Sequence, residues 1–334
     1  MDADSSPFSE NAGLHDILSL VFARLDGLSL YAAAATCKMW HGCAVASREK
    51  DDIKFKLNKF DLVRRVELLE WAKKGGFLPA LDKEASDPYG MLAVRMTIFA
   101  VSMENLASLQ WLRANGYPWG TIVCNMTARK GALAALQWAR KNNFPWAAWT
   151  CAFAARGGHL ALLQWARKNG CPWDFETCHN AAGGGHLEVL RWARDNGCEW
   201  NDRTCAYAAQ GGHLAVLQWA RKNGCPWNFE TCAYAAFGGQ LIVLQWARKN
   251  GCEWNWLTCA NAANRGRLDT LQWARKNGCP WDRWTCFYAA LRGHLTILQW
   301  ARENGCEWNK ADCLRQAHIQ DHTDVEAWIT AQPE

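Results

Sequence analysis

Apolar positions recur with a period of 27 residues over most of the chain. Tryptophan stands at positions 111, 138, 165, 192, 219, 246, 273 and 300, and a second tryptophan column follows eight residues later. A cysteine column keeps the same period from Cys124 to Cys313. Such a period indicates a solenoid, in which each unit packs on its neighbours. The weaker copies around Trp71 and Trp328 are expected to be terminal caps.

Each unit predicts two short helices. The Asn or Asp after the second tryptophan, such as Asp174, is a natural N-cap, and a first helix then runs through T-C-x-x-A-A to a Gly pair. A second helix runs from about Leu187 through Trp192 and ends at Asn-Gly, where Gly197 can adopt the left-handed conformation. The first helix places its Cys and two Ala residues on one side, a stripe that lets neighbouring helices approach closely.

Residues 204–228, TCAYAAQGGHLAVLQWARKNGCPWN, carry a family resemblance. They resemble the ankyrin repeat, which reads T-P-L-H-x-A, then A-x-x-G-H, a leucine-rich helix and G-A-D-V-N. The unit here has 27 residues instead of about 33, and the missing residues fall where ankyrin repeats carry a β-hairpin finger. The resemblance implies an all-α, ankyrin-like solenoid of helix–turn–helix units without fingers. Similar Trp- and Cys-rich shortened repeats occur in large DNA viruses of amoebae.

The side of the first helix opposite the Cys–Ala stripe varies most between copies. Its positions lie two residues before, two after and five after each cysteine, and several hold Trp, Tyr or Arg, which anchor many protein interfaces. We therefore predict a target-binding face; neutral variation of a solvated face is the alternative. The predicted face consists of Trp149, Phe153, Arg156, Glu176, Asn180, Arg203, Tyr207, Gln210, Glu230, Tyr234, Phe237, Leu257, Asn261, Asn264, Trp284, Tyr288 and Leu291. Glu176 is expected to face outward and to touch a partner.

The second helices carry a basic stripe. Its arginine column runs from Arg140 to Arg302 and its lysine column from Lys141 to Lys276, both with the 27-residue period. The stripe could follow the phosphates of a nucleic acid. Solvated side chains that complement the helix dipoles explain the same residues and are favoured, because the net charge of +5 is small for 334 residues.

The histidine and cysteine columns are interpreted as structural. His159, His186, His213 and His294 occupy the ankyrin Gly-His position, and Gln240 and Arg267 replace them in other copies. CPWDFETC places Cys171 and Cys178 seven residues apart, but the column of Cys171 holds Tyr117 and Phe144 in two units. An aromatic residue cannot replace a zinc ligand or half a disulfide. We therefore predict packing cysteines, no metal site and no cofactor.

The composition and the N-terminal residues narrow the class of protein and its compartment. Half of the residues are hydrophobic, so a large core can form. The acidic start MDADSSPFSE is unlike a secretory signal peptide, and no apolar run approaches the roughly 20 residues of a membrane span. With 16 cysteines, these features favour a reducing compartment, the cytoplasm or nucleus, or the host cytoplasm for a viral protein.

Residues 14–40, LHDILSLVFARLDGLSLYAAAATCKMW, predict two apolar helices outside the repeat. They resemble the F-box, although the opening Leu-Pro pair is not intact, Gly27 stands for Pro and Thr36 for Val. The resemblance implies docking on the Skp-type adaptor of a cullin–RING ubiquitin ligase. From the residues alone, an apolar cap on the solenoid is the alternative. The residues implied to dock are Leu14, Ile17, Leu18, Phe22, Leu25, Leu30 and Trp40.

The sequence thus predicts four segments: a disordered N-terminus (1–10), an F-box-like unit (11–50), a junction with a degenerate first repeat (51–90) and the solenoid with its C-terminal cap (91–334). No Gly-rich phosphate loop or nucleophile–base set is found, so we expect no enzyme. The leading function is a monomeric substrate adaptor that brings an unknown target protein to the ligase. The alternatives are a scaffold without ligase coupling and, less favoured, nucleic-acid binding.

Overall fold

The computed structural model describes residues 105–117 and 120–333, together with positions 66, 69, 70, 73, 96, 97 and 99–101. Within these residues all regular structure is helical and no strand is present, which confirms the predicted all-α fold without hairpin fingers. The predicted N-terminus, residues 1–10, and the F-box-like unit, residues 11–50 with its implied docking residues, lie outside the described residues.

The chain divides into two compact units, residues 1–127 with 132–145 and residues 128–131 with 146–334. The first unit contains α6 (Leu106–Ala114), α8 (Leu133–Lys141) and most of α7 (Thr121–Lys130). In α6 the Asn105 side chain caps the helix by accepting from Ser108 N–H at 3.0 Å. Leu112 and Leu136 are completely buried on the apolar sides of α6 and α8.

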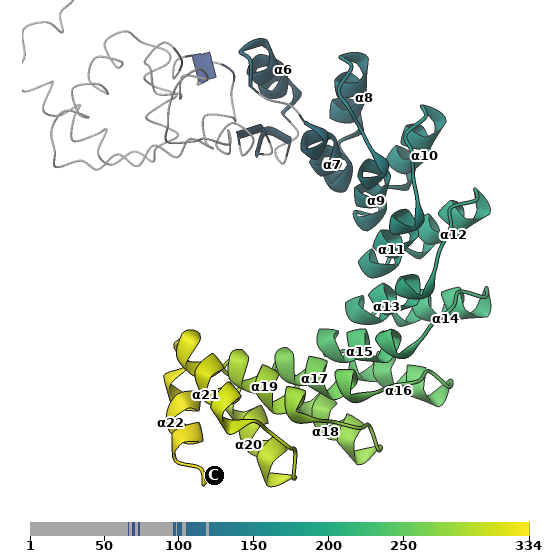
Figure 1. The fold of residues 1–334 in the computed structure, drawn as a ribbon. Helices are drawn as coiled ribbons and strands as arrows, with labels where there is room; N and C mark the ends of the chain where they lie inside the picture. Colours follow the sequence, from purple (N-terminus) through teal and green to yellow (C-terminus); the bar gives the residue numbers. More distant parts are fainter. Residues whose placement is uncertain are drawn as a thin grey trace, which may run out of the picture. The chain divides into compact units, whose positions relative to one another are not determined.

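The second unit alternates first and second helices through seven repeats (Figure 1). The first helices are α9 (Ala148–Arg156), α11 (Phe175–Gly184), α13 (Asp202–Gly211), α15 (Phe229–Gly238), α17 (Trp256–Asn264), α19 (Arg283–Leu291) and α21 (Lys310–Ile319). The second helices are α10 (Leu160–Lys168), α12 (Leu187–Asp195), α14 (Leu214–Lys222), α16 (Leu241–Lys249), α18 (Leu268–Lys276), α20 (Leu295–Glu303) and α22 (Thr323–Thr330).

The helix ends follow the predicted signals. The side chains of Asp174, Asn201, Asn228, Asn255 and Asp282 each accept a hydrogen bond from the backbone N–H two residues later, at 2.8–3.0 Å. These bonds satisfy N–H groups that a helix cannot pair internally. At the other end of α12, Gly197 has φ +82° and Cys198 N–H donates to Ala193 O at 2.9 Å, a C-terminal turn that glycine adopts without strain.

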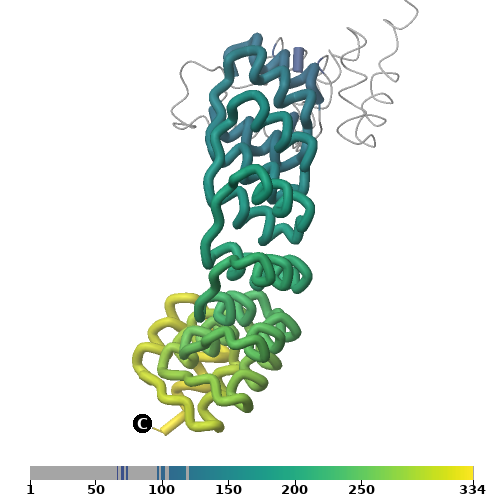
Figure 2. The backbone as a smooth tube through the Cα atoms, turned by 90° about the vertical axis from the view of Figure 1, so that its right-hand side faces the viewer, coloured from purple at the N-terminus to yellow at the C-terminus, as the bar shows by residue number. Residues whose placement is uncertain are grey.

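Two layers result, and they are packed differently. Cys178, Ala181 and Ala182 of α11 are completely buried, and each first helix packs closely on the first helix of the next repeat. Successive second helices approach one another less closely. Between α9 and α20 the first helices therefore line the inner side of a curve and the second helices its outer side (Figure 1). When the molecule is turned by 90°, the backbone follows the same helix–turn–helix path in one repeat after another (Figure 2).

Candidate interaction surface

The first-helix face is the side of α9, α11, α13, α15, α17 and α19 that carries the 17 residues predicted to bind a target. None of the 17 is buried. Trp149, Arg156 and Arg203 are exposed, and the other 14 are partly exposed. The structure thus places the whole set on accessible positions of one helical layer, and target binding by it stays a prediction.

Aromatic side chains connect neighbouring positions on this face. The rings of Tyr207 and Tyr234, from adjacent repeats, meet edge to face with centroids 5.9 Å apart. Within single helices, Trp149 contacts Phe153 at 5.9 Å and Trp284 contacts Tyr288 at 6.1 Å. Rings held by other rings lose little side-chain entropy when a partner binds, which suits them as anchors.

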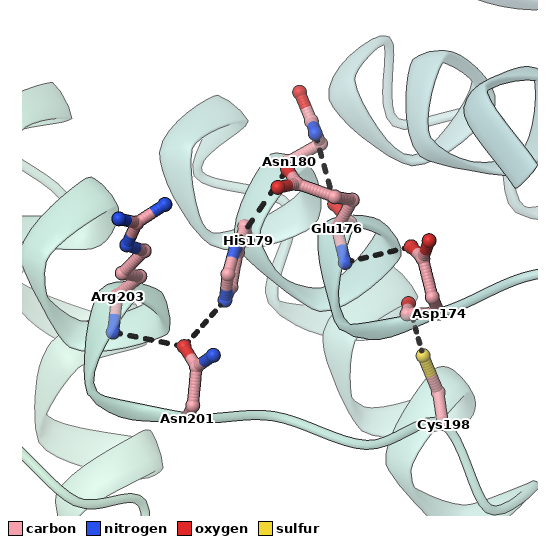
Figure 3. A network of polar contacts seen from close by, with 7 residues as sticks. All are labelled: Asp174, Glu176, His179, Asn180, Cys198, Asn201 and Arg203. Carbon is pink, nitrogen blue, oxygen red and sulfur yellow. Dashed lines mark hydrogen bonds and ion pairs between the residues drawn. The ribbon is translucent and has the colours of Figure 1, made fainter.

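His179 interrupts the small-residue pattern of the first helices (Figure 3). The same position is Ala152 and Ala206 in the two adjacent repeats. The His179 side chain is 1% exposed, its Nε2–H donates to Asn201 Oδ1 at 2.7 Å, and its ring stacks on Tyr207. Because Asn201 also caps α13, this bond joins α11 to the start of the next first helix. Burial lowers the pKa of His179, although Asn201 and Glu176 partly oppose the shift.

Glu176 is less available than its position predicts. Its side chain is 23% exposed, and its Oε2 lies 3.6 Å from Nδ1 of His179 (Figure 3). Asn180 Nδ2 donates to the Glu176 backbone carbonyl at 2.8 Å, and the Glu176 N–H donates to Asp174. The Glu176 carboxylate therefore faces a buried side chain of its own helix as well as solvent.

Sequence reasoning missed the first residue of each first helix. Phe175 and Trp256, at this position, are large apolar residues that are each 39% exposed. The signal was present, because the same column also holds Asp202 and Arg283 and so varies as strongly as the predicted face.

A cavity of about 310 Å³ lies between α19 and α21. It opens beside Trp284, a member of the first-helix face. Arginines and aromatic rings supply much of its wall. The lining residues are Arg283, Trp284, Phe287, Asn309, Asp312, Cys313, Arg315 and Gln316.

The arginines of the predicted basic stripe have structural partners instead of standing free in solvent. Arg167 donates to the backbone carbonyl of Cys171, and its guanidinium lies 4.2 Å from the ring centroid of Trp173. The Trp173 ring also contacts Trp192 on the next second helix, and the two ring centroids are 5.7 Å apart. The sequence suggested either phosphate binding or solvated side chains that complement the helix dipoles. Neither interpretation included this stacking, because it depends on how the loop folds back over the helix.

The arrangement recurs as an Arg–Trp–Trp ladder that bridges successive second helices. Guanidinium-to-ring distances are 4.1–4.6 Å and ring-to-ring distances are 5.7–6.0 Å. The steps are Arg167–Trp173–Trp192, Arg194–Trp200–Trp219, Arg221–Trp227–Trp246, Arg248–Trp254–Trp273, Arg275–Trp281–Trp300 and Arg302–Trp308–Trp328. The partner lysines, such as Lys168 and Lys222, are exposed.

The histidine column joins repeats through the backbone. His159 Nε2 lies 2.9 Å from Arg129 O, and His186 Nε2 lies 3.1 Å from Arg156 O, thirty residues earlier in each case. Each ring nitrogen thus satisfies a carbonyl at the end of the preceding first helix, one of the groups that a helix leaves unpaired. This contact accounts for histidine in the turn without a catalytic role.

The cysteines pair in an order that sequence reasoning missed. Cys178 Sγ lies 3.9 Å from the carbonyl oxygen of Cys198, twenty residues later, and Cys232 Sγ lies 4.0 Å from that of Cys252. The same two cysteine columns recur in six repeats. Within the described residues, no group of three or more His, Cys, Asp or Glu side chains could hold a metal ion. The thiol pairs are Cys151–Cys171, Cys178–Cys198, Cys205–Cys225, Cys232–Cys252, Cys259–Cys279 and Cys286–Cys306.

Part of the repeat array matches a known protein family. The family model for ankyrin repeats, which occur in many copies, matches residues 178–221, the segment from α11 to α14. No curated protein matches the chain. The solved ankyrin repeat domain of human ASB11 is similar over 55% of this chain and 99% of its own length, with 16% identity and a TM-score of 0.41. The match to the family model shows ankyrin-like repeats in residues 178–221. None of the helices in its described part is long and apolar enough to span a membrane.

Proposed function

We propose that this chain is a non-enzymatic protein-binding module whose first-helix face holds a target protein. The observation that carries the proposal is the contrast within each first helix: a constant, buried Cys–Ala side and a varied, accessible side rich in aromatic residues and arginine. Aromatic and arginine side chains supply most of the energy in protein interfaces, whereas packing alone would not require them at exposed positions.

The test of this face compares two layers of the same protein. A photo-crosslinking amino acid is placed in cells at Tyr207 or Tyr234, and at the exposed second-helix residues Gln218 or Gln245 as matched controls. We expect one protein to be captured at least about tenfold more efficiently from the first-helix positions, and Phe237→Ala to reduce that capture. Equal capture from both layers would assign the interaction elsewhere.

We further propose that residues 11–50 couple this module to the Skp-type adaptor of a cullin–RING ubiquitin ligase. The support is the sequence resemblance of residues 14–40 to the F-box, together with a repeat surface suited to hold a substrate. In this arrangement catalysis belongs to the partner complex, and the protein acts as a monomeric adaptor in the cytoplasm or nucleus. The Trp- and Cys-rich repeats support a viral origin, and with it a host-cell target.

Ligase coupling is tested with a purified Skp-type adaptor and the full-length chain. We expect co-elution from a gel-filtration column, lost in the variant L25D/L30D. Ile242→Asp is the control, because Ile242 is 70% exposed on the second-helix layer. Retained co-elution in L25D/L30D, or none with the wild type, would leave the scaffold without ligase coupling as the better function.

A further inference from the structure

Six repeats of the second unit contain a buried thiol pair, the set defined above. In each pair the first cysteine lies on the first helix and the second lies in the loop that follows the second helix of the same repeat. All twelve residues are 0–1% exposed. The contact is close, since Cys178 Sγ is also 3.9 Å from the carbonyl oxygen of Cys198, and Cys232 Sγ is 4.0 Å from that of Cys252.

The pairs that contain Cys198, Cys252 and Cys306 are polarised in one direction. The loop thiol donates to the backbone carbonyl of the residue that precedes the first helix, as Cys198 does to Asp174 O at 3.2 Å and Cys252 to Asn228 O at 3.3 Å. The hydrogen bond between the thiols raises the pKa of Cys178 and lowers that of Cys198, and the Arg194 guanidinium lowers both. In these three pairs the loop sulfur is therefore the member that carries negative charge more easily.

We propose that these six thiol pairs are oxidation sites, at which a peroxide converts each pair to a disulfide within one repeat. Two observations carry this assignment: in α11 and α15 the first-helix Sγ lies 3.9–4.0 Å from the carbonyl oxygen of the loop cysteine, and the two cysteine columns keep the 27-residue period through six repeats. A packing role alone does not require sulfur at either position, because alanine fills the rest of the first-helix stripe and the buried Tyr117 and Phe144 fill the loop column in two other repeats.

The reaction balances with one hydroperoxide for each pair. The loop thiol loses its proton, its thiolate attacks one peroxide oxygen, and the O–O bond breaks to leave a sulfenic acid and, after proton uptake, water. The first-helix sulfur then attacks the sulfenic sulfur, and a second water leaves. Two thiols are oxidised to one disulfide while one peroxide is reduced to two waters. Because the thiols are covered, we expect the rate to follow local opening of the loop.

Each disulfide would close a loop of about twenty residues that contains the whole second helix of its repeat. Such a cross-link restricts the unfolded chain and leaves the stacked face of the first helix in place. Oxidation would therefore stiffen each repeat separately, without a covalent bond between repeats. The first-helix face would keep its side chains in the same positions.

The experiment uses the purified full-length chain, with hydrogen peroxide added in small excess under native conditions and the remaining thiols then alkylated. We expect non-reducing peptide mapping to find the six bonds of the defined pairs, each with a loss of about 2 Da. The thermal midpoint should rise by about 5 °C or more and return after treatment with dithiothreitol.

Two variants keep the proposal open to refutation. Cys225→Ser should leave five of the six disulfides, with Cys205 recovered as a thiol, whereas Cys313→Ser should leave all six because position 333, twenty residues on, is proline. The proposal fails if the bonds join Cys171 to Cys178 or link different repeats or chains. It fails equally if oxidation ends at sulfinic acid, or if these twelve thiols react only after denaturation.

Discussion

The two helical layers of the second unit solve the same packing problem in different ways. First helices meet directly through completely buried residues such as Cys205 and Ala209, so their spacing is set by small side chains. Second helices are bridged by large ones, an arginine and two tryptophans at every step. The bridge uses the Trp and Arg positions of the second helices, and these are constant from α10 to α20. Direct contact leaves the accessible side of the first helices free to vary, which is why that side is the candidate interaction surface.

Removing one step of the Arg–Trp–Trp ladder should cause the largest loss of stability. Trp227→Ala loses both the Arg221 guanidinium and the Trp246 ring, and we expect the free energy of unfolding to fall by about 3 kcal/mol. Urea unfolding of the full chain, followed by circular dichroism, measures this loss. Trp256→Ala is the matched control on the first-helix layer, and it should cost less than about 1 kcal/mol because Trp256 is exposed. Equal losses would remove the distinction between the layers.

A larger side chain between neighbouring first helices should cause the second-largest loss of stability. Ala235→Leu adds three carbons where no space is free, and we expect a loss of about 2 kcal/mol in the same urea experiment. Ala215→Leu makes the identical change at an exposed position of α14 and should be close to neutral. If Ala235→Leu is also neutral, the spacing of the first helices is not set by small residues.

A conservative change in the bridge tests whether its geometry matters beyond its charge. Arg221→Lys keeps the positive charge but loses the planar group that stacks on Trp227 and donates to the Cys225 carbonyl. We expect a loss of about 1 kcal/mol, also from urea unfolding. The neighbouring Lys222→Ala should change stability by less than about 0.5 kcal/mol. A fully stable Arg221→Lys protein would reduce the arginine column to a charge stripe.

The smallest expected effect concerns His179, the one buried histidine among the described residues. Burial lowers its pKa in the folded state, so the unfolded chain binds more protons as pH falls. Stability is therefore present above the unfolded pKa of about 6.5 and declines below it. Between pH 7.5 and 5.5, His179→Ala should lose less stability than the wild type, by under about 1 kcal/mol.

The control for this titration is Gln218→Ala, which changes an exposed side chain of α14 and leaves every histidine in place. We expect its loss of stability between the two pH values to equal that of the wild type. His213 and His294, whose pKa values are also lowered by burial, remain in both variants and supply a common background. An unchanged pH dependence in His179→Ala would show that the buried ring does not titrate in this range.

The sequence correctly predicted the features that depend on neighbouring residues alone, such as helix caps and helix ends. Asp174 and Asn201 cap helices because their side chains reach the nearest N–H groups, and Gly197 ends a helix because it tolerates positive φ. A period arranges residues in columns, but it does not say which members of two columns meet. Cys178 has a cysteine seven residues before it and another twenty after it, and only the path of the loop selects Cys198.

The same reason explains the missed roles on the surface. Arg167 looks solvated in a helix diagram, because the loop that brings Trp173 over it is absent from such a diagram. The outward direction of Glu176 follows from helical geometry, whereas its approach to His179 depends on a substitution in the same turn that other repeats lack. The accessible positions of the first-helix face needed only the helical period, so the sequence located them.

The hydrogen bonds of the histidine column have a consequence for how the protein is made. Within the histidine column, the bond from His322 to Leu291 O spans 31 residues, and those of His159 and His186 span 30. A chain whose contacts are this short in sequence needs no distant segment to complete a repeat. Each repeat can therefore become stable soon after its successor leaves the ribosome, and the structure can grow in the direction of translation.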